Sequence, residues 1–160
     1  MTTQQDYQTR MTLETDIITF LSEEWNVTPI RTTQSRFCPV DCILTKNDNF
    51  VAICEVRTRR DKWDDVQRWG GMFLNYIKLN NAIEMSRQFC VPFLFVAYFI
   101  PDDILMYWKV TNDKGQIQIE MTLTSRNAQD NIADGKDVKR IRNVVMLPNN
   151  PKVINNAVIK

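Results

Sequence analysis

Two neighbouring stretches decide the fold: CPVDCILTK at residues 38–46 and FVAICEVRTR at residues 50–59, joined by Asn-Asp-Asn at 47–49. If residues 47–49 form the loop, antiparallel pairing sets 45 opposite 51, 43 opposite 53 and 41 opposite 55. Asp41 and Glu55 then become cross-strand neighbours with Cβ atoms roughly 5 Å apart, which destabilises a hairpin unless a cation neutralises them. This register predicts a divalent-cation site, with Arg57 on the same face as Glu55.

A second register is open to the same sequence. A two-residue turn at Asn47 and Asp48 would set Glu55 opposite Val40 and leave Asp41 opposite Cys54. We favour the three-residue loop because Asn and Asp tolerate positive φ and because it aligns the branched apolar residues of the two strands.

Length and composition indicate one globular domain. The chain has 160 residues, enough to bury a proper hydrophobic core. We expect one domain over residues 1–160, with its core at about 12–123 and a partly irregular segment at 124–160. The chain contains no histidine. This excludes Ser-His-Asp and Cys-His nucleophile systems, so hydrolysis would depend on carboxylates, lysine and a hard metal ion.

The chain carries no membrane or export signal that we can identify. No apolar run approaches the roughly 20 residues that span a bilayer, and the first ten residues lack the apolar segment of a secretion signal. We therefore expect a cytoplasmic protein. The cysteines show no paired C-x-x-C spacing, and Cys42 and Cys54, opposite each other in the hairpin, are expected to be buried free thiols.

Basic residues gather in two groups although the net charge is only +1. From Leu123 onward seven basic residues stand against three acidic ones, a difference of +4. A second group lies directly beside the acidic pair, and we expect it to contact a phosphate backbone, although a solvated surface would have the same composition. Its members are Arg57, Arg59, Arg60, Lys62 and Arg68.

The remaining segments predict a mixed sheet between helices. Helices are expected at about 12–25, with Thr12 as N-cap, and at 62–89, where Gly70-Gly71 suggests a close approach or a break. A strand is expected at 27–35, a central buried strand at 91–100, and a second hairpin from 105–110 and 116–123. Residues 124–139 read as a loop, 144–147 as a short edge strand and the tail from Pro148 as weakly ordered.

Pro39-Val40-Asp41 followed by Glu55-Val56-Arg57 on a hairpin resembles the PD-(D/E)xK nuclease superfamily, and in particular its small phage-type members. The resemblance covers about residues 12–110. It implies an α/β, restriction-endonuclease-like fold, in which a mixed central sheet is flanked by helices, and a nuclease that hydrolyses DNA phosphodiester bonds with Mg²⁺ or Mn²⁺. It also implies that Asp41, Glu55 and the carbonyl of Val56 are metal ligands and that Glu14 is an accessory acid.

Arg57 stands where the family has lysine. Arginine stays protonated, so it can clamp a phosphate or stabilise a transition state but cannot act as a base. Either arginine suffices, or a lysine of the following helix replaces it, or the site is degenerate. Lys78 is our preferred replacement and Lys62 the nearer alternative; for Lys78, a solvated helix lysine is an equally good interpretation.

The partner implied is DNA, whose duplex, branched or single-stranded form the sequence leaves open, and family members commonly pair as homodimers. Arg59, Arg60, Lys62 and Arg68 are the expected nucleic-acid contacts. Trp63 and Trp69 would stack on bases or pack in the core. A catalytically degenerate protein that binds nucleic acid or a protein is the main alternative, and a virion or assembly component whose carboxylates form salt bridges is a third.

Overall fold

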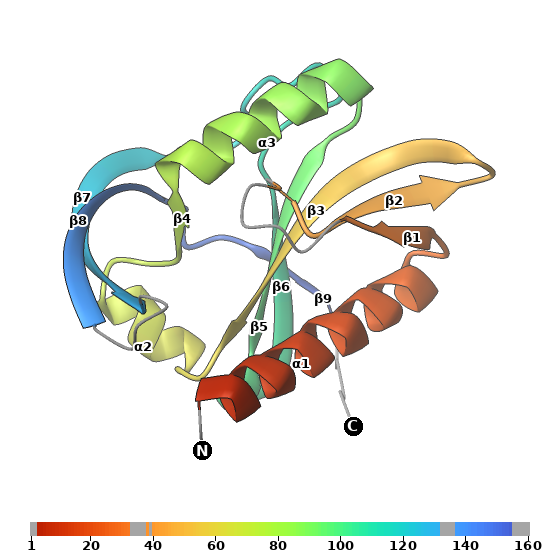
Figure 1. The fold of residues 1–160 in the computed structure, drawn as a ribbon. Coiled ribbons are helices and arrows are strands. Elements are labelled where there is room, and N and C mark those ends of the chain that lie inside the picture. Colours follow the sequence, from red (N-terminus) through yellow and green to blue (C-terminus); the bar gives the residue numbers. More distant parts are fainter. Residues whose placement is uncertain (1–2, 33–37, 39, 132–136, 155–160) are drawn as a thin grey trace.

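The computed structural model describes residues 3–32, 38, 40–131 and 137–154, and its centre is a six-stranded mixed sheet (Figure 1). The order across this sheet is β1-β2-β3-β5-β6-β9, and the only parallel pair among these strands is β3 with β5. The bounds are β1 Thr28–Arg31, β2 Cys42–Lys46, β3 Asn49–Arg59, β5 Phe93–Phe99, β6 Ile104–Lys109 and β9 Lys152–Ile154. The prediction of an α/β fold with a mixed central sheet is confirmed.

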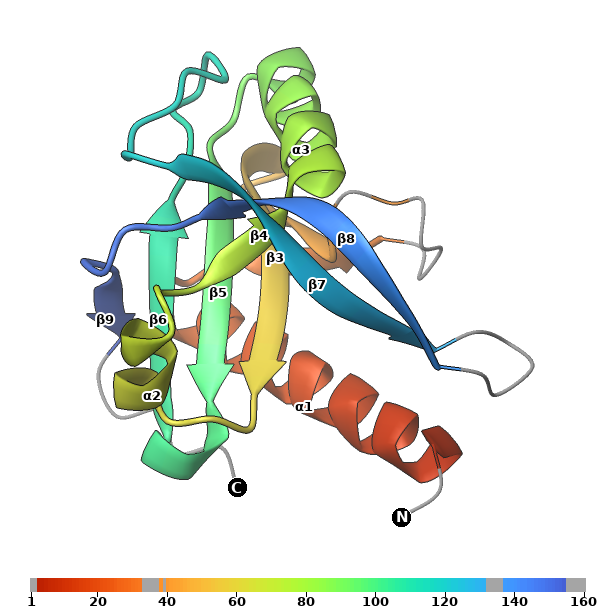
Figure 2. The same cartoon turned by 90° about the vertical axis from the view of Figure 1, so that its left-hand side faces the viewer.

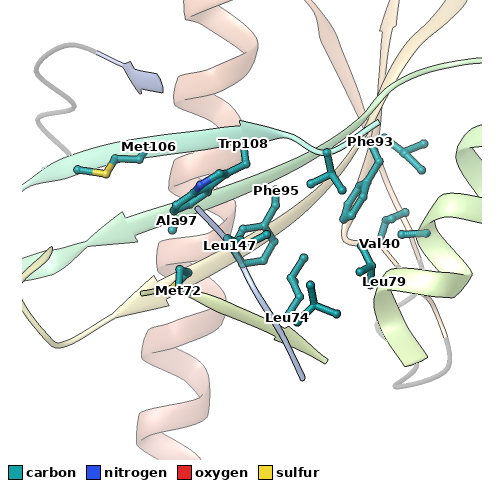
Figure 3. Close-up of a cluster of buried hydrophobic side chains, with 14 of the residues drawn as sticks. Val40, Met72, Leu74, Leu79, Phe93, Phe95, Ala97, Met106, Trp108 and Leu147 are labelled. Carbon is teal, nitrogen blue, oxygen red and sulfur yellow. The ribbon is translucent and has the colours of Figure 1, made fainter. Parts of the chain in front are cut away.

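Helices cover both faces of this sheet, as Figure 1 shows. Helix α1 (Thr3–Glu24) packs Ile17 and Leu21 against one face. Helix α3 (Tyr76–Phe89) packs Leu79 and Ala82 against the other, where the larger core cluster gathers around Phe93 (Figure 3). All seven residues of β5 are buried, so it is a central strand as predicted.

The hairpin β2–β3 has a different turn from the predicted one but keeps the predicted register at its far end. Asn47 and Asp48 form a two-residue turn with φ of 51° and 63°, which pairs Lys46 with Asn49 and Thr45 with Phe50. The register then shifts between Leu44 and Thr45. This bulge adds one residue on β3, so 43 still pairs with 53 and 42 with 54.

The predicted long helix at 62–89 is wrong, because the chain breaks at Gly70 and Gly71, which have φ of +105° and +102°. The segment instead forms helix α2 (Trp63–Arg68), strand β4 (Phe73–Asn75) and helix α3. A Cβ on Gly71 would lie 2.8 Å from Asn149 Oδ1 and 3.2 Å from the Leu147 carbonyl. The glycine pair therefore both interrupts the helix and lets residues 147–149 approach the backbone at Gly71.

A second sheet replaces the loop and edge strand predicted near the C-terminus. Strands β7 (Thr122–Asn131) and β8 (Asp137–Met146) form a long antiparallel hairpin, and β8 pairs with β4. The hairpin predicted from 105–110 and 116–123 does not form, because β6 pairs with β5 and β9 and residues 116–121 are not a strand. Ile117 forms an isolated bridge with Thr111, beyond the end of β6. The segment 144–147 was predicted as an edge strand, but β8 lies at the centre of its sheet, in the order β4-β8-β7.

Two further boundaries differ from the sequence-based prediction. Helix α1 begins at Thr3, so Thr12 is an internal residue whose hydroxyl donates to the Gln8 carbonyl at 3.0 Å, and it is not an N-cap. Part of the tail from Pro148 forms β9, which pairs with β6, while residues 155–160 lie outside the described part. Nine residues of α1 precede Thr12. None of the described helices is long and apolar enough to cross a membrane.

Candidate active site at the open end of the first hairpin

Strand β3 extends beyond its partner β2 at the candidate site. The β2–β3 ladder ends at Cys42↔Cys54, whereas β3 continues to Arg59, paired with β5 on its other side. No other strand in the described part of the chain pairs with this stretch of β3. Its edge is therefore open to side chains from flanking elements, which is the place where polar groups can approach a strand backbone.

Asp41 occupies this open edge. Its amide donates to the Cys54 carbonyl at 2.9 Å, and its carboxylate Oδ2 accepts from the Val56 amide at 2.7 Å. Asp41 was expected to be the ladder partner of Glu55, but it reaches β3 through its side chain instead. The reason is that the ladder ends one residue earlier, at Cys42.

Glu55 is buried at 1 % exposure and binds two cationic side chains through one oxygen. Its Oε1 accepts from Lys78 Nζ at 2.7 Å and pairs with Arg57 Nη2 at 2.9 Å. Its Oε2 is buried, and no described residue gives it a hydrogen-bond partner. Burial raises the pKa of Glu55 to about 7, an effect that Arg57 opposes, Asp41 reinforces and Lys78 opposes.

Lys78 reaches Glu55 because α3 starts at a fixed point. Asn75, the last residue of β4, caps the helix with its side chain, which accepts from the amides of Ile77 and Lys78. Lys78 lies in the first turn of α3, over the sheet face that bears Glu55. Lys62, the alternative replacement for the family lysine, is exposed just before α2.

Glu14 approaches the same region from α1 and is itself mostly buried, at 9 % exposure. Burial raises the pKa of Glu14 and the charge of Asp41 raises it further, while Arg57, Arg10 and Arg31 lower it. The charge of Asp41 therefore raises the pKa of both glutamates, Glu14 on α1 and Glu55, which binds Lys78 of α3. Arg10 and Arg31 are not among the site residues predicted from the sequence. Arg10 lies four residues before Glu14, on the same side of the helix, but the helix was predicted to start only at Thr12.

The four basic residues predicted to contact nucleic acid lie at the end of β3 and around α2. Arg59 forms an ion pair with Asp61 at 2.9 Å, and Arg68 lies 3.7 Å from Asp65 with 77 % of its side chain exposed. Arg60 and Lys62 are also exposed. All four stand close in sequence to the open edge of β3.

The two tryptophans differ from each other. Trp63 packs against the rings of Phe99 and Trp108 with centroids 5.2 and 6.1 Å away, so it belongs to the core. Trp69 is 55 % exposed.

The donor set can be compared with the needs of a hard divalent cation. Within residues 3–32, 38, 40–131 and 137–154, no three His, Cys, Asp or Glu side chains cluster closely enough to hold a metal ion. Two carboxylates and a main-chain carbonyl make a different donor set, all oxygen, of the kind that Mg²⁺ accepts. The buried Oε2 of Glu55, which has no hydrogen-bond partner in the described part of the chain, fits such a ligand.

Comparison with known proteins gives a family and a structural neighbour. Residues 2–148 match the protein family described as "Phage putative PDDEXK endonuclease". A Holliday junction resolvase from Archaeoglobus fulgidus is similar in structure, with a TM-score of 0.48 and 15 % sequence identity over 62 % of this chain and 75 % of the resolvase. No curated protein matches the sequence.

Proposed function

The chain belongs to the family of phage PDDEXK endonucleases, and from this premise we propose that it hydrolyses phosphodiester bonds in DNA with a bound Mg²⁺ or Mn²⁺. The observation that carries the proposal is the junction of Asp41 and Glu55 at the open edge of β3. It is supported by a buried Glu55 oxygen for which the described residues offer no partner.

Asp41, Glu55 and the carbonyl of Val56 are the residues that would hold the cation. When bound, such a cation lowers the pKa of a water molecule and stabilises negative charge on the phosphate. The bond between Asp41 Oδ2 and the Val56 amide fixes the carboxylate beside β3 at 2.7 Å. The influence of Asp41 on the pKa of Glu55 supports the closeness of the two carboxylates.

The cationic side chains have separate roles in this proposal. Lys78 is fixed at 2.7 Å from Glu55 and is only 29 % exposed, which suits a group that orients the attacking water. Arg57 has 41 % of its side chain exposed, so its guanidinium can bind a phosphate and stabilise the charge that develops on it. Glu14 acts as an accessory acid from α1.

The partner in this proposal is DNA, with Arg59, Arg60, Lys62 and Arg68 contacting its backbone near the scissile phosphate. A phage-encoded enzyme of this kind would act in the host cytoplasm as one domain over residues 1–160. Two copies of the chain would place one active site at each strand of a duplex, which is why we include a homodimer in the proposal.

The test is cleavage of supercoiled plasmid and branched DNA with added Mn²⁺ or Mg²⁺. We expect nicked or linear product from the wild-type chain and none from Asp41→Asn. Asp64→Asn is the matched control, since Asp64 is an exposed acid in the first turn of α2 and should leave cleavage unchanged. Intact DNA with the wild-type chain and both metals would contradict the proposal.

A second candidate function is a nuclease-fold protein that binds nucleic acid, or a protein, without cleaving. The observation in its favour is that Arg57 and Lys78 both neutralise Glu55 through Oε1. Such ion pairs satisfy a buried carboxylate without any metal. Binding of DNA with no cleavage and no affinity for Mn²⁺ would favour this function over the first.

A further inference from the structure

The hairpin β7–β8 is used by none of the roles above, although it carries a concentrated positive charge. Five consecutive pairs, from Thr124↔Val144 to Ala128↔Arg140, contain three arginines and no acidic residue. The arginines are Arg126, Arg140 and Arg142. Acidic residues appear only nearer the tip of the described strands, as Asp130 and Asp137.

Two of these arginines are placed directly opposite each other. The register pairs Arg126 with Arg142. Like charges at opposed positions of an antiparallel ladder weaken it. An arrangement that costs stability in the free protein is stabilised when a polyanion binds, because phosphates neutralise both guanidinium groups.

The hairpin is fixed next to the candidate active site. Strand β8 pairs Val144 with Asn75, and Asn75 is the residue that caps α3 three positions before Lys78. From Val144 to Asp137 the strand continues for seven residues, which spans about 24 Å. Figure 2 shows the far end of the hairpin and the N-terminal end of α1 extending past β3 on the same side of the molecule.

The composition of the hairpin favours a double-stranded ligand. Single-stranded nucleic acid is bound mainly by stacking bases on aromatic side chains, and residues 122–131 and 137–146 contain no Phe, Tyr or Trp. A two-stranded β-ribbon matches the width of the major groove of B-form DNA, about 12 Å.

We propose that β7–β8 binds the backbone of duplex DNA beside the candidate active site, through Arg126, Arg140 and Arg142. This binding surface adds to the proposed function, and it rests on that function because the substrate there is DNA. The contacts are to phosphates, so they add affinity and orientation without sequence preference.

The experiment measures binding of a labelled duplex of about 30 base pairs by fluorescence anisotropy in EDTA, at KCl from about 50 to 200 mM. Arg126→Ala/Arg140→Ala/Arg142→Ala should weaken binding by about tenfold or more. It should also make the slope of log K against log [KCl] shallower by about 2.7, since each phosphate contact contributes about 0.9. The corresponding triple Arg→Lys variant should recover most of the lost slope.

The matched control removes three exposed lysines outside the hairpin: Lys109 of β6, Lys114 of the following turn and Lys152 of β9. Figure 2 shows β6 and β9 at the sheet edge away from the projecting hairpin. Changing these lysines to alanine should alter duplex affinity by less than about twofold. Circular dichroism checks folding, and Arg126→Gln/Arg142→Gln, which relieves the opposed pair, is a second variant expected to fold at least as stably.

Three results would overturn the inference: an unchanged salt slope in the triple Arg→Ala variant and in Arg126→Gln/Arg142→Gln, tighter binding of single-stranded DNA or duplex RNA than of duplex DNA, or no duplex binding by the wild-type chain. Cleavage with Mn²⁺ separates this from the proposed function. If the wild-type chain cleaves but the triple Arg→Ala variant and Arg126→Gln/Arg142→Gln bind duplex DNA normally, only the hairpin inference fails. If duplex binding depends on the arginines but nothing is cleaved, only the nuclease activity fails.

Discussion

The hairpins β2–β3 and β7–β8 are held in place in different ways. The first lies inside the main sheet, where Leu44 and Ile53 are buried, and its acidic residues stand where its pairing ends. The second is anchored at one end by the short strand β4, and Leu123 near its base is 59 % exposed. Burial thus fixes the first hairpin and the catalytic geometry that we propose for it, whereas the described burial in the second lies at its base, at Val144 and Val145 of β8, where β4 also pairs with it.

The largest expected difference between the hairpins is in cleavage. Glu55→Gln removes one proposed cation ligand, which is worth several kcal/mol of transition-state stabilisation, or roughly 10³-fold in rate. The triple Arg→Ala variant of β7–β8 should keep its rate within about threefold under single-turnover conditions with the enzyme saturating. Equal losses of rate in both variants would erase the functional distinction between the two hairpins.

Stability should separate the two hairpins next. Ile53→Ala leaves a cavity in the core between β2, β3 and α3 and should lower the free energy of unfolding by about 2–5 kcal/mol. Leu123→Ala, at an exposed position of β7, should change it by less than about 0.5 kcal/mol. Urea denaturation followed by circular dichroism measures both. Comparable losses would mean that β7–β8 is packed as tightly as β2–β3.

The buried acid of the first hairpin also predicts a pH dependence in metal-free buffer. The pKa of Glu55 is raised from 4.5 to about 7, so the folded chain binds this proton more tightly than the unfolded chain does. Stability from this group is fully present below pH 4.5 and is lost as the pH rises through about 7, a loss of about 3 kcal/mol. Glu14, whose pKa is also raised, acts in the same direction.

Glu55→Gln should flatten this decline in urea denaturation across that pH range. Glu84→Gln is the control, since Glu84 is an exposed acid of α3, and it should leave the decline unchanged. A Glu55→Gln protein with an undiminished pH dependence would mean that Glu55 is ionised throughout and held by Lys78 and Arg57.

The smallest expected effect concerns the turn of the first hairpin. Asp48 has φ of 63°, a conformation that glycine adopts without steric cost. Asp48→Gly, which creates the Asn-Gly turn typical of two-residue hairpins, should raise stability by roughly 0.5–1 kcal/mol. Asn49→Gly, at a position without positive φ, should lower it by a similar amount. A loss of stability in Asp48→Gly would contradict the turn that we describe.

The sequence predicted the first hairpin well because its apolar residues alternate within a buried sheet, and one register satisfies them. The bulge near Thr45 was not predicted. A three-residue loop without a bulge and a two-residue turn with a bulge both give the pair Ile43↔Ile53, so the apolar pattern does not distinguish them. The choice of Lys78 came from the family resemblance, and the structure places it against Glu55.

The second hairpin could not be read from the sequence in the same way. Its strands are polar and lack a strict alternation of apolar residues. Their pairing depends on β4, which was hidden inside an apparently continuous helical pattern. The chain breaks at Gly70 and Gly71, and β4 follows the break. The apolar residues on either side keep helical spacing, so the apolar pattern did not indicate the break.

The most direct test of the central claim is Mn²⁺ binding followed by electron paramagnetic resonance, with wild-type, Asp41→Asn, Glu55→Gln and Asp64→Asn proteins in the absence of DNA. We expect the wild-type chain and Asp64→Asn to bind Mn²⁺ alike, and each of the other two variants to bind it at least about tenfold more weakly. Equal affinity in all four proteins, or no binding by the wild-type chain, would contradict a cation site shared by Asp41 and Glu55.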